Sequence, residues 1–251
     1  MSDGFFVAEL APGLKPGDQV SLTGPEARHA GVVRRLRPGE TVVLTDGTGR
    51  GITGSVATVG PDQVTVTLTA WLDQPERYPI ITIVQALPKK DRADLAIDLM
   101  TEVGVDRIVP WQAARCVSRW SPDKAVAGRA KWQAVAREAS KQARRLRFPV
   151  VEPLATTAEV IDLIRAVPVA LVAHEQAVTP LDGDEAGQIE RCLIVIGPEG
   201  GLTADEVAAF QAAGAQTYSL GPTVLRTSTA GAIAIAQLRA LWQAAPARRP
   251  R

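Results

Sequence analysis

The hydrophobic pattern of the sequence changes once, near residue 74, and this change limits the folds that the chain can adopt. Before it, short runs of alternating apolar and polar residues are separated by glycine and proline. After it, continuous apolar runs alternate with long amphipathic segments. The first pattern predicts strands with one exposed face, and the second predicts a parallel sheet covered by helices on both faces. We therefore expect a small β-domain over residues 1–73 and an α/β domain over residues 74–251.

The first domain is predicted to be a small antiparallel β-barrel. Its turns are marked by glycine and proline, as in Pro38-Gly39 and Gly60-Pro61. A helical pattern is present at about residues 26–37. The expected strands are 19–22, 41–44, 55–59 and 63–68.

The second domain is predicted to alternate strands with helices. Each helical segment has apolar residues at the spacing of one helix face, and the segment over 91–103 ends before Gly104. The expected strands are 80–86, 107–110, 169–173, 192–196 and 217–220. The expected helices are 91–103, 130–145, 158–166, 204–213 and 229–240.

Several classes of protein are disfavoured by composition. The longest apolar runs are far shorter than the roughly 20 residues of a membrane span, so we expect no membrane segment. The N-terminus has an acidic residue where a secretion signal has a basic one, so we expect a cytoplasmic protein. Two cysteines and two histidines, far apart in the sequence, are too few for a disulfide framework or a zinc module. We expect no metal.

Three loops are candidates for ligand binding because they follow predicted parallel strands, where ligands of open α/β sheets bind. These loops are 174–176, 197–201 and 221–226. The second contains three glycines in five residues, which lets the backbone approach a ligand, but a tight turn before a helix capped by Thr203 explains it equally well. The dinucleotide and phosphate-loop glycine motifs are absent. The hydroxyls of Thr227, Ser228 and Thr229 are expected to cap the last helix.

The charge is unevenly distributed, although 28 basic residues nearly balance 27 acidic ones. Residues 129–147 contain seven basic residues and one acidic residue, and a second basic cluster lies at residues 28–37. Such clusters favour binding to a phosphate backbone; the alternative is a solvated helix face. Aromatic residues make up only 4% of the chain, so we expect backbone contacts rather than base stacking to dominate.

Five stretches together resemble one family, the RsmE-type 16S ribosomal RNA uracil-N3 methyltransferases of the SPOUT class. They are residues 28–39, 85–92, 101–110, 196–201 and 220–230, and their order and spacing cover nearly the whole chain. The resemblance implies a PUA-like β-barrel that binds RNA, followed by a SPOUT domain whose C-terminal loops form a trefoil knot. It also implies methylation of N3 of one uridine, uridine 1498 in the family, in the 16S rRNA of the small ribosomal subunit.

The resemblance further implies a set of site residues. In the family the knot loops bind S-adenosylmethionine, Arg226 would stabilise charge on the uracil, and Arg145 or Gln142 would position the RNA. The implied cofactor-binding residues are Leu171, Val172, Ala173, His174, Glu175, Ile196, Gly197, Pro198, Glu199, Gly200, Gly201, Ser219, Leu220, Gly221, Val224, Leu225, Arg226 and Ala230. The implied RNA-binding residues are Arg28, His29, Arg34, Arg35, Arg37, Lys141, Arg144, Arg145 and Arg147.

The chain departs from the family pattern in several places. Thr223 and Ser228 replace an arginine and a glutamate, and Leu99 replaces a lysine. In addition, the stretch 141–145, Lys-Gln-Ala-Arg-Arg, is present where the family usually has Glu-Gln-Ser-x-x-Arg. Two alternatives follow: a SPOUT methyltransferase acting on a ribose 2′-hydroxyl, and an RNA-binding relative without turnover. The resemblance also implies a homodimer with a shared active site, formed through the apolar segment 230–242; alternatively, that helix is central to its own knot.

Overall fold

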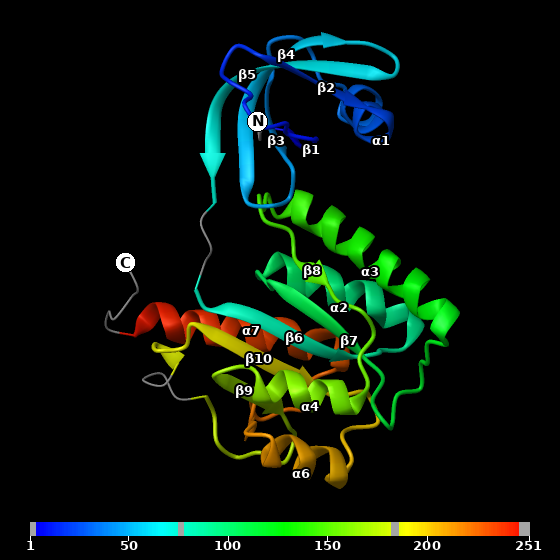
Figure 1. The fold of residues 1–251 in the computed structure, drawn as a ribbon, viewed down its shortest axis with the longest axis vertical. Coiled ribbons are helices and arrows are strands. Elements are labelled where there is room, and N and C mark those ends of the chain that lie inside the picture. The colour runs from blue at the N-terminus through cyan, green and yellow to red at the C-terminus, as the bar shows by residue number, and fades with distance from the viewer. Residues whose placement is uncertain (1–3, 75–77, 182–185, 246–251) are drawn as a thin grey trace. The chain divides into compact units, whose positions relative to one another are not determined.

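The computed structural model describes residues 4–74, 78–181 and 186–245, which form two compact units (Figure 1). Unit 1 contains the described residues up to Gln74 together with Ser140–Phe148. Unit 2 contains the described residues of 78–139 and those that follow Phe148. The segment 140–148 therefore belongs to the unit that is otherwise N-terminal, although it is far from that unit in the sequence.

Unit 1 is built on a five-stranded sheet with the order β1-β3-β4-β5-β2. All neighbouring strands are antiparallel except β1 and β3, which are parallel. The wholly antiparallel arrangement that we predicted is thus wrong for this pair, because four residues are too few to show an alternating pattern for β1. The strands are β1 (Gly4–Val7), β2 (Gln19–Thr23), β3 (Thr41–Thr45), β4 (Arg50–Val59) and β5 (Gln63–Asp73).

The predicted helix over residues 26–37 is divided into two short pieces. The α-helix α1 (Gly24–Arg28) leads directly into a π-helical turn, η1 (His29–Val33). The turn ends because Arg35 adopts the left-handed conformation, with φ of 52°, and the N–H of Leu36 then donates to the carbonyl of Ala30 at 3.0 Å.

The segment 140–148 is held to unit 1 by backbone and side-chain hydrogen bonds. The Thr45 hydroxyl donates to the Leu146 carbonyl at 3.1 Å, and the Phe148 N–H donates to the Gly47 carbonyl at 2.9 Å. The Gln74 side chain accepts from the backbone N–H of Leu146 at 2.9 Å. These bonds satisfy the polar backbone of a segment that has no strand of its own.

Unit 2 has a six-stranded sheet with the order β11-β9-β10-β6-β7-β8, in which every pair is parallel. This confirms the predicted parallel α/β class. The two-residue strand β8 was not predicted, because it is too short to have a pattern. The strands are β6 (Ile80–Ala86), β7 (Arg107–Trp111), β8 (Val150–Val151), β9 (Val169–Ala173), β10 (Arg191–Ile196) and β11 (Gln216–Tyr218).

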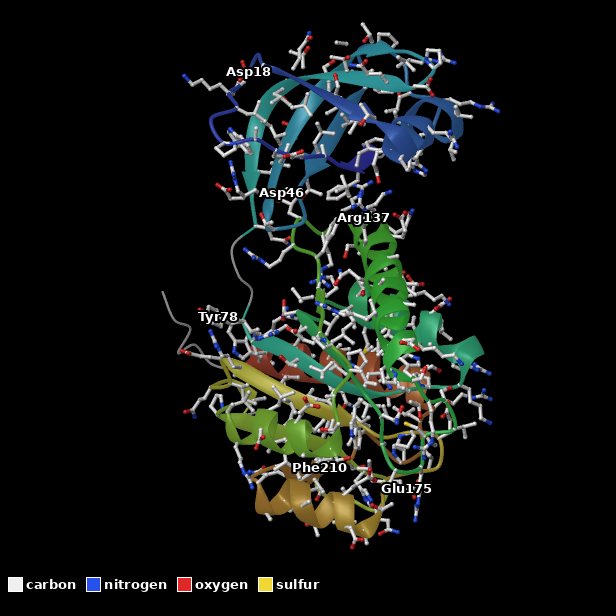
Figure 2. All side chains as sticks on the ribbon, turned by 45° about the vertical axis from the view of Figure 1, so that its right-hand side comes forward. Asp18, Asp46, Tyr78, Arg137, Glu175 and Phe210 are labelled. Atoms are coloured by element: carbon white, nitrogen blue, oxygen red, sulfur yellow. The ribbon has the colours of Figure 1, made fainter. Side chains whose placement is uncertain are left out.

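Helices cover both faces of this sheet, with α2 and α7 packed together on one face and α4 and α6 on the other (Figure 1). Phe210 of α6, labelled in Figure 2, packs edge-to-face against Trp111 of β7 with ring centroids 5.5 Å apart. No helix in the described ranges is long and apolar enough to cross a bilayer. The helices are α2 (Lys90–Glu102), α3 (Pro122–Gln142), α4 (Thr157–Arg165), α6 (Ala204–Ala212) and α7 (Thr227–Ala244).

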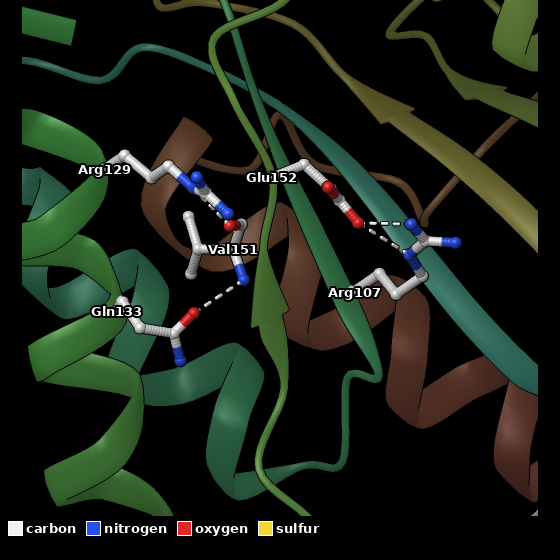
Figure 3. Close-up of polar contacts among 5 residues, drawn as sticks. All are labelled: Arg107, Arg129, Gln133, Val151 and Glu152. Atoms are coloured by element: carbon white, nitrogen blue, oxygen red, sulfur yellow. Dashed lines mark hydrogen bonds and ion pairs between the residues drawn. The ribbon is translucent and has the colours of Figure 1, made fainter. Parts of the chain in front are cut away.

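The prediction for α3 is wrong at both ends. The helix begins earlier, at Pro122, and it stops at Gln142 because Arg144 has a left-handed φ of 52°. Part of its basic character serves the fold of unit 2. Arg129 Nε donates to the Val151 carbonyl at 2.8 Å, beside a bond of 2.9 Å from the Val151 N–H to Gln133 (Figure 3).

Candidate active site

Strands β11, β9, β10 and β6 are parallel neighbours, so the loops that follow them leave the same edge of the sheet. Backbone bonds tie two of these loops together. The His174 N–H donates to the Tyr218 carbonyl at 3.1 Å, and the Ser219 N–H donates to the Thr179 carbonyl at 2.9 Å. The structure thus brings together the loop after β9 and the loop after β11, as the sheet order requires.

The glycine-rich loop 197–201 joins the same group. The Thr227 hydroxyl, at the start of α7, donates to the Gly197 carbonyl at 3.1 Å. On its other side the loop reaches the segment after β6, where Glu199 accepts from the Lys89 N–H at 3.0 Å. All three predicted loops therefore lie at one place in unit 2.

Arg115 braces this loop, and sequence reasoning missed it. Its guanidinium Nη1 donates to the carbonyls of Gly200 and Leu202, each at 3.2 Å. A Cβ atom on Gly200 would lie 3.1 Å from the Arg115 Cβ and 3.2 Å from its carbonyl oxygen. The absence of a side chain at Gly200 therefore lets Arg115 pack closely against the backbone of the loop. Arg115 follows β7 at the same edge of the sheet, which is the signal that could have found it.

Thr203 caps α6 as predicted. Its hydroxyl accepts from the Glu206 N–H at 3.1 Å, and Glu206 accepts in return from the Thr203 N–H at 2.8 Å. The buried Glu206 carboxylate also accepts from the Ala114 N–H at 2.8 Å. The helix cap and the segment that contains Arg115 are thus fixed to each other.

The start of α7 differs from the prediction. The N-cap residue is Arg226, and no side chain caps the helix. The hydroxyls of Thr227 and Thr229 are directed elsewhere, to the Gly197 carbonyl and to the Arg226 carbonyl at 3.1 Å. Ser228 is buried, and its Oγ has no hydrogen-bond partner in the part of the chain that the structure describes. Arg226 itself is exposed at this edge.

The three loops combine apolar side chains with freely approachable backbone. Leu171, Ile196 and Ala230 are buried, and Leu220 and Leu225 are half-buried against them. Gly221 has φ of 142° with no atom within 4 Å of the position of a Cβ, so the backbone there has a conformation that favours glycine. Apolar walls with exposed backbone polar groups are suited to a nucleoside-containing ligand.

Two buried ionisable groups of the sheet, Cys192 at the start of β10 and Tyr218 at the end of β11, are not available as proton acceptors. Burial raises the pKa of the Cys192 thiol to about 12 and raises that of the Tyr218 hydroxyl as well, so both remain protonated at neutral pH. His174 accepts at Nδ1 from the Gln176 N–H at 3.2 Å, and Glu175 beside it is exposed (Figure 2). No group of three or more potential ligands for a metal ion occurs among the described residues.

The basic residues that we predicted to bind RNA are concentrated in unit 1. Arg28, Arg34, Arg35 and Arg37 are exposed on and after α1 and η1, whereas His29 is half-buried. Gln142 and Arg144 are exposed and Arg145 and Arg147 are half-buried, all within 140–148. The predicted RNA-binding residues at 28–37 and at 141–147, which are far apart in the sequence, therefore share one compact unit, whereas Arg129, Lys131 and Arg137 lie in unit 2.

Lys141 is an exception. Its ammonium group is 2.9 Å from a carboxylate oxygen of Glu26, and the side chains are only 6% and 12% exposed. The prediction that Lys141 contacts RNA is inconsistent with this burial. The pair instead joins α1 to the segment 140–148 within unit 1.

Comparison with known proteins shows the class to which these two units belong: RNA methyltransferases that combine an α/β domain with a PUA domain. Residues 75–239 match the RNA methyltransferase domain family, and residues 22–69 match the RNA methyltransferase PUA domain family. The predicted PUA-like class of the first domain is confirmed.

Individual relatives identify the family within this class. The chain is 43% identical over 231 residues to ribosomal RNA small subunit methyltransferase E of Mycobacterium tuberculosis, covering 89% of this chain and 88% of that protein. It is 28% identical over 248 residues to the Bacillus subtilis protein of the same name, covering 93% and 94%. The chain belongs to the ribosomal RNA small subunit methyltransferase E family. The solved structure of the Neisseria gonorrhoeae member bound to S-adenosyl methionine has a TM-score of 0.84 and 28% identity, and covers 96% of this chain and 98% of that one.

Proposed function

We propose that this protein transfers a methyl group from S-adenosylmethionine to N3 of one uridine in the 16S rRNA of the small ribosomal subunit, uridine 1498 in the family. The observation that supports this most directly is the junction of three loops at the carboxyl edge of the parallel sheet in unit 2. A family member with a similar fold has S-adenosyl methionine bound.

The residues at the junction fit this cofactor. Leu171, Ile196, Leu220 and Leu225 would contact the adenine, and the backbone of the loops 197–201 and 219–226 would contact its polar groups and the ribose. The other predicted cofactor-binding residues, such as Val172, Glu175 and Val224, belong to the same loops or to the ends of the strands that precede them. When bound, the cofactor supplies an electrophilic methyl group on a sulfonium.

The protein must hold the uracil in line with this methyl group and stabilise the charge that develops on the base. Uracil N3 is weakly acidic and loses its proton when it is methylated, so negative charge develops on the neighbouring carbonyl oxygens. The exposed Arg226 guanidinium is our candidate for stabilising that charge. Gln142 and Arg145 of unit 1 are candidates for positioning the RNA. Because N3 lies on the pairing edge, the target base must be unpaired or flipped out.

RNA would be held mainly through phosphate contacts. The predicted RNA-binding arginines of unit 1 are exposed or half-buried, and arginine pairs well with phosphate. Lys141 is excluded from this set by its burial against Glu26. The candidate phosphate ligands are Arg28, Arg34, Arg35, Arg37, Arg144, Arg145 and Arg147, with His29 beside them.

We further infer a cytoplasmic homodimer with a trefoil knot at the three loops. Helix α7 is apolar around much of its circumference, and Ile233 on it remains 40% exposed while Leu241 and Trp242 are half-buried. A second copy would cover this surface in an isologous interface of roughly 1,600 Å² in total, and the shared active site that the family resemblance implies would lie beside it.

The test is a methyl-transfer assay on small subunits that lack this modification, followed by mass spectrometry of the nucleosides. We expect 3-methyluridine at one position, with Arg226→Lys as a matched variant of much lower rate. A 2′-O-methyl nucleoside would indicate a different SPOUT activity. RNA binding without any methylated product would identify a relative without turnover, a possibility raised by Thr223 and Ser228.

A further inference from the structure

A cavity of about 350 Å³ lies on unit 1. It is lined by Gly24, Pro25, Arg28, His29 and Val33, where α1 meets η1. Its volume is within the range of small-ligand sites. All five residues belong to one short stretch of chain, so the cavity is a property of unit 1 alone.

The wall of the cavity is largely apolar and accessible. Val33 is 65% exposed, and the adjacent Val32 is 61% exposed. The His29 ring is held in place by edge-to-face contact with Phe6, with ring centroids 5.9 Å apart. Among the described residues, no atom lies within 4 Å of the position of a Cβ on Gly24.

The surroundings of the cavity are strongly basic. Arg28 lines it, and three more exposed arginines follow within the next nine residues, at 34, 35 and 37. Glu26 is the one acidic residue in the sequence between positions 24 and 37. It is half-buried, and its carboxylate is 2.9 Å from the Lys141 ammonium group. Its charge is therefore compensated, and the electrostatic field at the cavity favours an anion.

An apolar wall beside a cationic rim matches a nucleotide, which has an apolar base face and a phosphate. We propose that this cavity binds one unpaired nucleotide of the RNA substrate, with the base against Val33, Pro25 and His29 and the phosphate near Arg28. The inference rests on the proposed function only in taking RNA as the ligand. It adds a base contact that the scarcity of aromatic residues would not predict.

The experiment separates base contacts from phosphate contacts by using two probes. Binding is measured for a fluorescent ten-residue oligouridylate and for polyphosphate, which has similar charge and no bases. We expect Val33→Ser to weaken oligouridylate binding about tenfold, which is the scale of losing the burial of one valine side chain, and to leave polyphosphate binding unchanged. Val126→Ser, which alters a 76% exposed valine on α3, is the control and should change neither.

His29→Ala provides a second variant and should have the same selectivity for the probe with bases. The proposal is overturned if Val33→Ser weakens both probes equally, if it weakens neither, or if the wild-type protein does not bind oligouridylate at low salt. It is also overturned if Val33→Ser weakens binding only to assembled small subunits and not to protein-free 16S rRNA, because a ribosomal protein would then occupy the cavity. A wild-type protein that binds oligouridylate through Val33 but transfers no methyl group would refute the proposed function and leave the cavity assignment intact.

Discussion

Replacing Arg144 by glycine should weaken RNA binding without destabilising the protein. Helix α3 ends in a Schellman arrangement, in which the Arg145 N–H donates to the Ser140 carbonyl at 2.9 Å and Arg144 has φ of 52°. Helices α2 and α6 end in the same way and have Gly104 and Gly214 at the equivalent position, with φ of 97° and 106°. Arginine is therefore present at α3 where local backbone preference favours glycine.

The expected change in stability is small because two effects oppose each other. A left-handed conformation costs a non-glycine residue about 1 kcal/mol or more, and glycine adds about 0.4–1 kcal/mol of unfolded-state entropy. The free energy of unfolding of Arg144→Gly should thus be unchanged or higher by at most about 1 kcal/mol. Urea denaturation of the two proteins measures this difference.

The expected change in RNA affinity has a characteristic salt dependence. Losing one phosphate contact should reduce the slope of log K against log salt concentration by roughly 0.7–0.9. Over a fourfold range of salt, this corresponds to an affinity ratio that changes about threefold. The assay is binding to small subunits at several potassium chloride concentrations. Arg165→Gln, which removes a charge at the end of α4 where Arg165 is 63% exposed, is the control.

An Arg144→Gly variant that folds normally and keeps both the affinity and the salt slope of the wild-type protein would refute the assignment. Arg144 would then be a solvated residue at a helix end. A variant with lower affinity and an unchanged slope would indicate that Arg144 acts on the shape of the segment 140–148 and not on a phosphate.

Three other changes test the described contacts. Lys141→Met removes the cation paired with the largely buried Glu26 carboxylate and should lower the free energy of unfolding by about 3 kcal/mol. Combining Lys141→Met with Glu26→Gln should recover much of this loss. Equal stability of the single variant and the wild type would show that the ion pair does not stabilise the fold. Arg115→Ala removes two donors to the loop 197–201 and should weaken S-adenosylmethionine binding roughly tenfold by calorimetry; unchanged affinity would mean that the loop holds its shape unaided. Ser228→Ala removes a buried hydroxyl that has no hydrogen-bond partner among the described residues, so thermal denaturation should show equal or higher stability. A loss of about 2 kcal/mol or more would show that this hydroxyl is hydrogen-bonded in solution. Light scattering should give twice 26.6 kDa for the protein at micromolar concentration, and a monomer with full activity would contradict the shared active site.

Gly200 and Gly221 differ as positions for probing the cofactor loops. A Cβ atom at Gly200 would lie 3.1 Å from the Arg115 Cβ, so a bulky residue there would displace the loop whether or not a ligand is bound. A loss of binding in Gly200→Val would therefore report a displaced loop and would not locate the cofactor. Gly221 has open space around its Cβ position, so Gly221→Ala is the cleaner probe of backbone conformation in the loop after β11.

Local pattern in the sequence determined the division into a β-rich unit and a parallel α/β unit, most of the strands, and the cap of α6 at Thr203. These features depend on residues close together in the chain, where periodicity and turn chemistry act directly. Strands β1 and β8 were missed because four and two residues are too few to establish a period.

Only the tertiary structure decided how distant segments are used. Lys141 pairs with Glu26, Thr227 donates to the Gly197 carbonyl, and Arg115 donates to the glycine-rich loop. Each of these contacts joins residues that are 30 to 115 positions apart in the sequence. Such contacts follow from the order of strands in a sheet and from the docking of the segment 140–148 onto unit 1. No local period records them, because the free energy that selects them comes from burial and hydrogen bonding between segments that meet only in the folded protein.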